Sequence, residues 1–521
     1  MIVMELFYTA NGCKKEANKE MSLLEELLLE GFDIGAACGG KGRCGKCKVR
    51  VVSGEAPVTA EDREVFSDEE LLEGWRLSCM LYPKGEVTVA FKTKDDAKFV
   101  AVSDYFKIQN ELPEADKAVS EADYEVAIDI GTTTLVFQLL EKKSGEIKNT
   151  ATAINSQRVY GADVVSRIMA SASGKQAELK ESIRKDLRQG ILALIGEYGI
   201  QIEQLTRIAI ACNTTMGHLL MGYDCKSLGT YPFTPVNVDF ITGSMEELLG
   251  MNGDAQVILL PGISAYIGGD IVAGMYACAF EQKEELSLLV DLGTNGEMAL
   301  GNRLKILAAS AAAGPAFEGG NIKWGMGSVE GAICSVELDG ANVKLHTILD
   351  KIPVGICGTG VVEAVAELLK EEFVDETGLL DEKYFDKGFP MGVTEDGRQI
   401  VLTQKDIREL QLAKAAIRAG IETLLFHYGV TKEQVSKVYL AGGFGYYLNV
   451  KKAIAIGLLP KEFELKTIAV GNTALEGAVR YLKDNGGRES MKKIISVSQE
   501  VSLSLDKSFN EFYIENMMFT K

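Results

Sequence analysis

The alternation of apolar and polar positions predicts a small α+β domain at the start of the chain. Apolar residues at helical spacing over residues 21–32 predict a helix that stops near Gly31. Short alternating stretches predict strands at 2–8, 47–54 and 85–92. Strands and a helix within residues 1–95 are typical of a domain in which a helix packs on a small sheet.

The pattern changes after residues 96–123, a polar stretch without sustained periodicity that we interpret as a linker. Beyond it, apolar strands that end in glycine-rich turns alternate with amphipathic helices. This alternation is typical of an α/β region with parallel or mixed sheets. The predicted strands with their turns are 125–134, 207–215, 286–297 and 437–445.

Two of these turns share one motif. "DIGTTT" begins at Asp129 and "DLGTNG" begins at Asp291, 162 residues later. A motif used twice predicts two related lobes, residues 124–285 and 286–521. The second lobe then carries a helix at 471–483, whose small residues suit close packing between lobes, and a C-terminal extension.

Composition narrows the set of partners. The 521 residues carry a net charge of −19, which repels nucleic-acid phosphates and anionic lipids. No apolar run reaches the roughly 20 residues that span a bilayer, and the start of the chain lacks the pattern of a signal peptide. We therefore expect a cytoplasmic protein with no nucleic-acid partner and no membrane partner, in which clustered cysteines hold metal.

Three of the ten cysteines lie in one loop, "ACGGKGRCGKC", residues 37–47. Together with Cys79 they give the spacing C-x5-C-x2-C-x31-C, close to the C-x4-C-x2-C pattern of plant-type ferredoxins. The loop glycines let backbone N–H groups turn toward the sulfurs. We predict a [2Fe–2S] cluster with the ligands Cys38, Cys44, Cys47 and Cys79. A zinc site, which usually takes two close cysteine pairs, and unligated thiols are the alternatives.

The first aspartate turn predicts a phosphate site. An apolar strand ends at Asp129, and Gly131, Thr132, Thr133 and Thr134 follow. A tight turn through glycine brings backbone N–H groups against phosphate oxygens, and the hydroxyls add donors. Asp129 would face a nucleotide-bound Mg²⁺, usually through water.

The second turn repeats the arrangement with Asp291, Gly293, Thr294, Asn295 and Glu297. Either turn alone is weak evidence, but two copies followed by "YLAGGFG" are more specific. Glycines there leave a surface on which an adenosine can lie, and a glycine turn at 355–361 would open a helix near the nucleotide. The expected contacts on this side are Gly358, Gly442, Gly443 and Phe444.

The order of these stretches resembles a known superfamily. "DIGTTT", "ACNTTMGH" (211–218), "DLGTNGE", "LAGGFG" and "GNTALEGA" follow one another as in the acetate/sugar kinase, Hsp70 and actin (ASKHA) proteins. This resemblance implies ATP between two lobes, with Asp129 and Asp291 holding Mg²⁺ through water. Residues 1–95 resemble the ferredoxin β-grasp domain. The expected fold is therefore an α+β ferredoxin-like β-grasp domain followed by a two-lobed α/β ASKHA domain.

Joined in one chain, the two parts resemble the reductive activators of corrinoid proteins. That resemblance implies an ATP-hydrolysing enzyme that passes an electron from a [2Fe–2S] cluster to Co(II) cobalamin and regenerates Co(I) for methyl transfer. It implies a corrinoid (cobalamin-binding) protein as partner and an upstream electron donor such as a ferredoxin or a flavoprotein. A homodimer is compatible with the sequence.

Two further residues are candidate catalytic groups. By the resemblance, Glu297 orients the attacking water; the alternative is a carboxylate on the lobe surface. We hypothesise that Ser310, in the small-residue stretch "AASAAAGPAFEGG", lies on the corrinoid-facing surface near cobalt. The alternative is a tightly packed loop of the lobe.

Three other functions are compatible with the same motifs. One is a small-molecule kinase with a redox-sensing appendage, which the sequence disfavours because acceptor-site bases beyond Glu297 and Asp270 are not obvious. Another is a redox-regulated interaction ATPase. The last is an activator of a different low-potential acceptor.

Overall fold

The computed structural model describes residues 5–8, 14–16, 21–29, 42, 45, 47–82, 87–91 and 123–519. The chain divides into two compact units. The first comprises residues 1–98 together with the segment Ser156–Ala170, and the second comprises residues 99–155 and 171–521. The predicted linker lies outside the described residues except for Asp123.

The first unit is built around a five-stranded sheet in the order β2-β1-β5-β3-β4. Strands β1 and β5 are parallel, whereas β2 pairs antiparallel with β1, and β3 pairs antiparallel with both β5 and β4. Leu23 and Leu27 of the first helix are fully buried together with Val49, Val87 and Val89 of the sheet. A helix packed on a mixed sheet of this order is the β-grasp arrangement that the sequence predicts. The elements are β1 (Glu5–Tyr8), β2 (Lys14–Glu16), α1 (Leu23–Leu29), β3 (Lys48–Ser53), α2 (Ala60–Val65), α3 (Asp68–Leu72), β4 (Trp75–Leu77) and β5 (Val87–Ala90), with α4 (Val164–Ala170) from the later segment.

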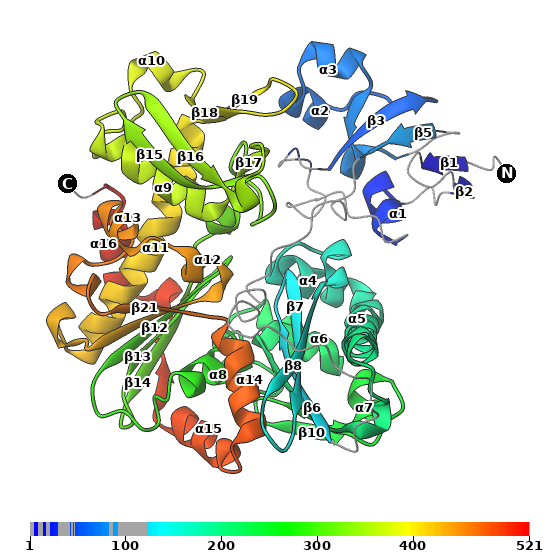
Figure 1. Cartoon of the computed structure of the whole chain (residues 1–521), viewed down its shortest axis with the longest axis vertical. Helices are drawn as coiled ribbons and strands as arrows, with labels where there is room; N and C mark the ends of the chain where they lie inside the picture. The colour runs from blue at the N-terminus through cyan, green and yellow to red at the C-terminus, as the bar shows by residue number, and fades with distance from the viewer. Residues whose placement is uncertain are drawn as a thin grey trace. The chain divides into compact units, whose positions relative to one another are not determined.

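The second unit consists of two lobes, each built on a six-stranded sheet (Figure 1). The first sheet has the order β10-β11-β9-β6-β7-β8 and the second the order β21-β20-β12-β13-β14-β22. The strands of the first are β6 (Tyr124–Ile130), β7 (Thr134–Glu141), β8 (Ile147–Ile154), β9 (Leu205–Cys212), β10 (Ile241–Ser244) and β11 (Gln256–Leu259). Those of the second are β12 (Ser287–Leu292), β13 (Gly296–Gly301), β14 (Ile306–Ala311), β20 (Lys437–Ala441), β21 (Thr467–Gly471) and β22 (Ser498–Glu500).

The two sheets repeat one topology. In each, the strand that ends in the aspartate turn pairs antiparallel with the next strand of the chain, β6 with β7 and β12 with β13. On its other side it pairs parallel with a later strand, β6 with β9 and β12 with β20. The fold thus confirms two related α/β lobes.

Helices cover the sheets, and the second lobe carries additional small sheets. These are formed by β15 (Ala332–Asp339), β16 (Asn342–Thr347) and β17 (Gly355–Ile356), and by β18 (Phe389–Val393) and β19 (Gln399–Leu402). The helices are α5 (Gln176–Tyr198), α6 (Thr214–Met221), α7 (Met245–Leu249), α8 (Gly269–Ala277), α9 (Gly358–Lys370), α10 (Glu382–Phe385), α11 (Gln404–Tyr428), α12 (Gly442–Tyr447), α13 (Val450–Ala455), α14 (Thr473–Lys483), α15 (Gly487–Ser496) and α16 (Lys507–Glu515).

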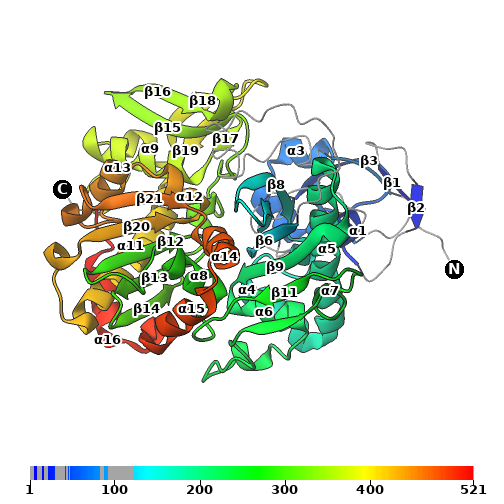
Figure 2. The same ribbon diagram turned by 60° about the horizontal axis from the view of Figure 1, so that its bottom comes forward.

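Helices α8 and α14 pack against each other between the two sheets (Figure 2). Their approach is close because small residues face each other: a Cβ on Gly477 of α14 would lie 2.2 Å from the backbone oxygen of Ala273 in α8. Arg480 of α14 also pairs with Glu281, which follows α8, at 2.7 Å. The predicted small-residue helix therefore forms half of the junction between the lobes.

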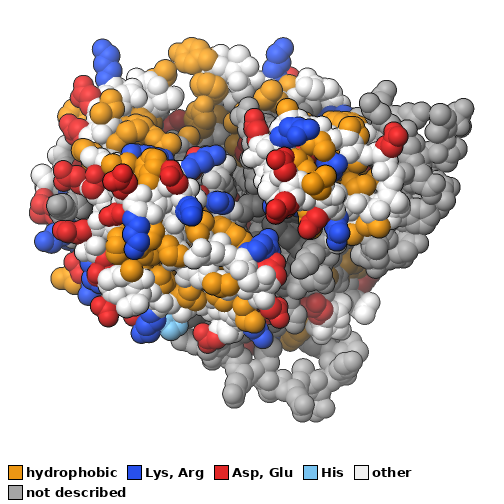
Figure 3. Space-filling view, turned by 90° about the horizontal axis from the view of Figure 1, so that it is seen from above, with side chains coloured by type: hydrophobic (Ala, Val, Ile, Leu, Met, Phe, Trp, Pro, Cys, Tyr) orange, Lys and Arg blue, Asp and Glu red, His pale blue; other side chains and the backbone are white. Residues whose placement is uncertain are grey.

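Acidic and basic side chains are interspersed over the face seen in Figure 3, with hydrophobic side chains between them. The negative net charge is therefore not gathered into one acidic field on this face. Among the described residues, no helix is both long enough and apolar enough to cross a lipid bilayer.

Candidate functional site

The two predicted aspartates occupy equivalent places in the two lobes. Asp129 is the next-to-last residue of β6, and Asp291 has the same place in β12. Each lies beside an alanine of the neighbouring parallel strand, Asp129 beside Ala211 and Asp291 beside Ala441. The small neighbours leave both carboxylates room at the end of their sheet.

Helices α8 and α14, which pack against each other, bring two further polar side chains to these aspartates. Asn472, the N-cap of α14, donates from Nδ2 to Oδ2 of Asp129 at 2.8 Å. Asp270 stands in the first turn of α8, and its charge acts on both Asp129 and Asp291. Three aspartates from both lobes therefore share one acidic site.

Burial dominates the electrostatics of this site. It raises the pKa of Asp129 to about 7, against the opposing hydrogen bond from Asn472 and with help from the charge of Asp270. Burial and the charges of Asp270 and Asp129 raise the pKa of Asp291 to about 7, and burial raises that of Asp270 to about 6. A cation at this point would lower all three values, because it favours the ionised carboxylates.

Glu297 and Ser310 lie beside Asp291 on successive strands. Glu297 of β13 pairs with Asp291 on one side and with Ser310 of β14 on the other. The Ser310 hydroxyl donates to Oε1 of Glu297 at 3.2 Å. Burial, together with the charges of Asp270 and Asp291, raises the pKa of Glu297 well above its usual range. Glu297 is thus part of the acidic site, and Ser310 contacts it directly.

The backbone around Ser310 does not form the packed loop that the sequence offered as an alternative. Residues Ile306–Ala311 form the strand β14, which pairs with β13 and β22. The small residues of this stretch, too small to form much core, suggested a tight turn or a surface that a partner approaches. The irregular backbone begins only after Ala311.

Both predicted phosphate turns are closed by backbone hydrogen bonds. The N–H of Gly131 donates to the oxygen of Thr134 at 3.0 Å, and the N–H of Gly293 donates to that of Asn295 at 2.9 Å. In the first turn, Oγ1 of Thr132 accepts a hydrogen bond from Nδ2 of Asn213, the N-cap of α6, at 3.2 Å. Of the other residues predicted for the two turns, Thr133 is exposed, whereas Thr134, Thr294 and Asn295 are half-buried.

On the predicted adenosine side, the glycines begin helices. Gly442, Gly443 and Phe444 form the first turn of α12, so the expected flat surface is a helix start. Gly442 has φ +85, and a Cβ there would lie 2.7 Å from Oδ1 of Asp291, which only glycine avoids. Gly358 begins α9, as predicted, and Phe444 stacks on Phe317 with ring centroids 4.8 Å apart.

Two of the four predicted cluster ligands lie among the described residues. Cys47 and Cys79 are buried, and their sulfur atoms are 3.3 Å apart. Two thiols from separate elements at this distance fit one metal centre. Cys38 and Cys44 lie outside the described residues.

Comparison with known proteins covers both units. Residues 9–84 match the model of the 2Fe-2S iron-sulfur cluster binding domain. Residues 124–283 match the RACo middle region, and residues 285–521 match the C-terminal domain of RACo, the ASKHA domain.

A corrinoid activation enzyme, RamQ of Eubacterium limosum, is 33% identical over 76% of this chain and 70% of its own length. The chain belongs to the reductive activators of corrinoid proteins. The [Co(II) methylated amine-specific corrinoid protein] reductase of Methanosarcina barkeri is 27% identical, over 75% of this chain and 76% of its own length. A solved structure, a reductive activator for corrinoid,iron-sulfur protein, has 28% identity and a TM-score of 0.70, and covers 99% of this chain and 98% of its own.

Membership in this family supports a [2Fe–2S] cluster in the first unit and an ASKHA fold in the second. Within the part of the chain that the structure describes, no group of three or more His, Cys, Asp or Glu side chains is arranged so that it could hold a metal ion.

Sequence reasoning left three site residues without a role at the nucleotide. Asp270, Asn472 and Asn213 reach the turns from the starts of helices α8, α14 and α6. Asn213 and Asn472 each precede a threonine, and a helix N-cap signal of this kind was available in "CNTT" and "GNTA". Asp270 follows only two glycines, and its sequence neighbours carry no comparable signal.

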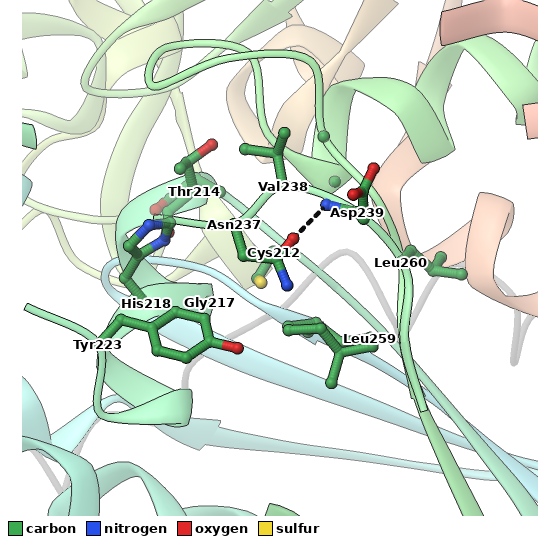
Figure 4. A pocket seen from close by; sticks show the side chains of 14 residues that line it. Cys212, Thr214, Gly217, His218, Tyr223, Asn237, Val238, Asp239, Leu259 and Leu260 are labelled. Atoms are coloured by element: carbon green, nitrogen blue, oxygen red, sulfur yellow. Dashed lines mark hydrogen bonds between the residues drawn. The ribbon is translucent and has the colours of Figure 1, made fainter. Parts of the chain in front are cut away.

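A pocket lies beside the acidic site in the first lobe (Figure 4). It is lined by residues of β9, β10 and β11, by α6, by the start of α8 and by the loops that join them, and its polar residues include Asn213, Thr214, His218 and Asn237. His218 is fixed in the wall, because Nδ1 lies 2.8 Å from the oxygen of Thr214 and Nε2 accepts from the N–H of Val236 at 2.9 Å. Burial lowers the pKa of His218, against the opposing hydrogen bond to the oxygen of Thr214.

Proposed function

We propose that this chain is an ATP-dependent reductive activator of a corrinoid protein. It passes an electron from its [2Fe–2S] cluster to Co(II) cobalamin and regenerates Co(I), while ATP drives movement of the two lobes. The observation that carries the proposal is the union, in one chain, of a cluster-binding domain and the double aspartate turn of an ATPase.

The reduction potentials explain why an electron-transfer cluster would be joined to an ATPase in one chain. Plant-type clusters have potentials near about −400 mV, and return of cobalamin from Co(II) to Co(I) demands a lower potential. A gap of 100 mV corresponds to roughly 2.3 kcal/mol per electron. ATP binding and hydrolysis offset a gap of this size if they favour a complex in which cobalt is easier to reduce.

In the proposed mechanism, ATP would supply the phosphoryl group that is transferred to water. Mg²⁺ would supply the positive charge that holds the nucleotide between the lobes. Asp129 and Asp291 would hold the cation through water, and Asp270, whose charge acts on both, would add a third carboxylate. The N–H and hydroxyl groups of the two turns bind phosphate oxygens. These turn residues are Gly131, Thr132, Thr133, Thr134, Gly293, Thr294 and Asn295. The starts of α9 and α12 bind the adenosine through Gly358, Gly442, Gly443 and Phe444.

Glu297 is proposed to orient the attacking water and accept its proton. Its support is the position one strand from Asp291 and the hydrogen bond that Ser310 donates to it. We also propose that Ser310 lies on the surface that faces the corrinoid. The two roles of Ser310 are separable, because loss of the Glu297 contact lowers ATP hydrolysis, whereas loss of a partner contact lowers only cobalt reduction.

The finer assignments are also proposals. They comprise the four ligands Cys38, Cys44, Cys47 and Cys79, the lobe boundary between 285 and 286, a cytoplasmic location, and a ferredoxin or a flavoprotein as electron donor. Sedimentation of the isolated chain distinguishes a monomer from a homodimer. The proposed cluster is tested by iron and acid-labile sulfide in anaerobically purified protein. We expect two of each per chain, lost in Cys79→Ser and kept in Cys225→Ser, a buried cysteine of the second unit.

The function is tested by cobalt absorbance. The anaerobic protein is mixed with a reductant, ATP and a Co(II) corrinoid protein. We expect Co(I) to form only with ATP. Loss of ATP without cobalt reduction, under stimulation by a small phosphoryl acceptor, would instead identify a kinase.

A further inference from the structure

A carboxylate of the small-residue stretch lies against the second phosphate turn. Glu318 is the last residue of the helical turn Pro315–Glu318, which follows β14. Its Oε1 atom lies 3.7 Å from the position that a Cβ on Gly293 would take. Burial raises the pKa of the Glu318 carboxyl, and hydrogen bonds from the side chain and the backbone N–H of Thr294 oppose this rise, because they favour the ionised form. Glu318 is therefore held by the same turn that we propose for a phosphate.

The donors that hold Glu318 are those that a phosphate oxygen would use at this turn. A carboxylate and a phosphate are both anions whose oxygens accept hydrogen bonds from N–H and hydroxyl groups. The donors of Thr294 cannot serve both anions at once, and the two negative charges repel each other. Glu318 and a nucleotide phosphate therefore compete for the second turn.

The first phosphate turn receives a side chain of the opposite kind. There, Oγ1 of Thr132 accepts from the amide of Asn213 at 3.2 Å. An amide donor brings no negative charge to the turn, and its N–H group does not take a donor away from a phosphate. The competing anion is thus a feature of the second turn, where Thr294 is held by an acceptor.

Glu318 can leave the second turn through a small change of the backbone. The helical turn that carries it lies between Gly314, with φ +79, and Gly319, with φ +76. Both angles lie in the left-handed region, and glycine passes between this region and others at little steric cost. The Glu318 side chain is exposed to solvent although surrounding atoms desolvate it, so water can replace Thr294 as its partner.

A shift of this helical turn would reach the residues proposed for the adenosine. Phe317, which precedes Glu318, stacks on Phe444 at the start of α12 with ring centroids 4.8 Å apart. Its backbone oxygen lies only 1.7 Å from the position of a Cβ on Gly358, the first residue of α9. Contacts this close leave little room for Phe317 to move without a response from both helix starts.

We propose that Glu318 is a built-in competitor of the nucleotide: its carboxylate occupies the phosphate place of the second turn until a nucleoside di- or triphosphate displaces it. The displacement moves the helical turn Pro315–Glu318 and, through it, the stretch that begins at Ser310. This inference rests on the proposed function, because that function places a phosphate at this turn.

The test measures binding of ADP with Mg²⁺, and of a non-hydrolysable ATP analogue with Mg²⁺, to the full chain by calorimetry. Glu318→Ala removes the competing carboxylate, so both nucleotides should bind about 10-fold more tightly. Glu318→Gln keeps the shape and an acceptor but loses the charge, so its affinity should lie between those of wild type and Glu318→Ala.

The matched control is Glu395→Ala, which removes an exposed carboxylate from the loop between β18 and β19 of the same lobe. Its nucleotide affinity should stay within about twofold of wild type. Unchanged or weaker binding by both Glu318 variants would overturn the proposal, and weaker binding would make Glu318 a part of the nucleotide site. If the wild-type chain binds neither nucleotide, the ATP dependence in the proposed function fails, which is a different result.

The competition for Thr294 is tested by a double-mutant cycle. Thr294→Val removes a hydroxyl that Glu318 and the phosphate would both use. Its loss should weaken nucleotide binding about threefold more in the Glu318→Ala chain than in the chain that keeps Glu318. Equal losses in the two chains would show that Glu318 and the nucleotide do not share this hydroxyl, and would overturn the competition.

The movement of the helical turn is measured by the fluorescence of Trp324. The backbone oxygen of Gly319 lies 2.1 Å from the position of a Cβ on Gly325, which follows Trp324. The chain has two tryptophans, so Trp75→Phe leaves Trp324 as the reporter. In this background the nucleotide should shift the emission of Trp324, and Glu318→Ala should show part of that shift before nucleotide is added. Emission that stays constant while the nucleotide binds would overturn the movement.

Discussion

The two lobes of the second unit share one framework and differ in the side chains that it carries. Asp129 and Asp291 have the same place in β6 and β12. On the strand next to each, the first lobe has Val136 where the second has Glu297. One strand further, the first lobe has Thr152 and the second has Ser310 in contact with Glu297.

This difference separates two tasks. In the proposed mechanism, each lobe supplies an aspartate and a turn that would bind the nucleotide and its cation. Only the second lobe adds a carboxylate one strand away, at a place where a water could be oriented. We therefore expect nucleotide binding to depend on equivalent residues of both lobes, whereas hydrolysis depends on Glu297 of the second lobe.

The largest effect is expected for the aspartate that the two lobes share, Asp129 in the first lobe and Asp291 in the second. Asp129→Asn and Asp291→Asn each remove one carboxylate from the acidic site, and each should lower ATP hydrolysis by about 100-fold or more. Phosphate release under saturating Mg²⁺ and ATP measures this loss. A variant that kept more than a third of wild-type turnover would show that its aspartate does not serve the cation.

The next effect is expected where the lobes differ. Glu297→Val gives the second lobe the residue of the first, and hydrolysis should fall by roughly 100-fold while ATP affinity stays within a few-fold. Val136→Ile is the control in the first lobe and should leave both quantities nearly unchanged. Normal hydrolysis in Glu297→Val would contradict the proposed role of Glu297 in orienting the water.

A pH dependence follows from the raised pKa values of Asp129 and Asp291, both about 7. In the unfolded chain these groups lose their protons near pH ~4, but in the nucleotide-free fold they retain them up to about 7. The free energy of unfolding should therefore decrease as pH rises from about 4 to 7, and level off above. Asp291→Asn should flatten this slope and stabilise the nucleotide-free protein at pH 8 by on the order of 1 kcal/mol.

Thermal unfolding across this pH range, with and without Mg²⁺ and ATP, measures the dependence. The cation and nucleotide should remove most of the slope, because they favour the ionised carboxylates. Stability that increases with pH over the same range would contradict the assignment of protons to this site.

The smallest effect is expected for Ser310→Ala. Loss of one hydroxyl donor to Glu297 should lower ATP hydrolysis by about fivefold. Thr152→Ala, at the equivalent place in the first lobe, should have no effect. If cobalt reduction falls much further than hydrolysis, Ser310 also contacts the corrinoid side. If neither rate changes, both proposed roles of Ser310 are wrong.

The sequence predicted the parts of the fold that are local. The strands that carry Asp129 and Asp291 near their ends are each specified by short stretches, in which glycine and strand-forming residues have one simple interpretation. The double motif also indicated two lobes, and the comparisons bear out both the family and the ASKHA fold.

The parts that the sequence did not predict depend on distant contacts. Asn472 reaches Asp129 across 343 positions, because the start of α14 packs on the opposite lobe. Asp270 joins the site only through the matching packing of α8. Ser310 was placed in a loop or on a partner surface since alanines surround it, yet β13 and β22 hold those alanines in a strand. Local propensity is overridden there by pairing on both sides.

The central claim is that electron transfer from the first unit depends on the nucleotide cycle of the second. The most direct measurement is the yield of Co(I) from a Co(II) corrinoid protein with the cluster fully reduced beforehand, in wild type and in Asp291→Asn. The account predicts Co(I) in the wild type with ATP and almost none in Asp291→Asn, although both chains hold the same iron and the same reduced cluster. Equal Co(I) in the two proteins would contradict it.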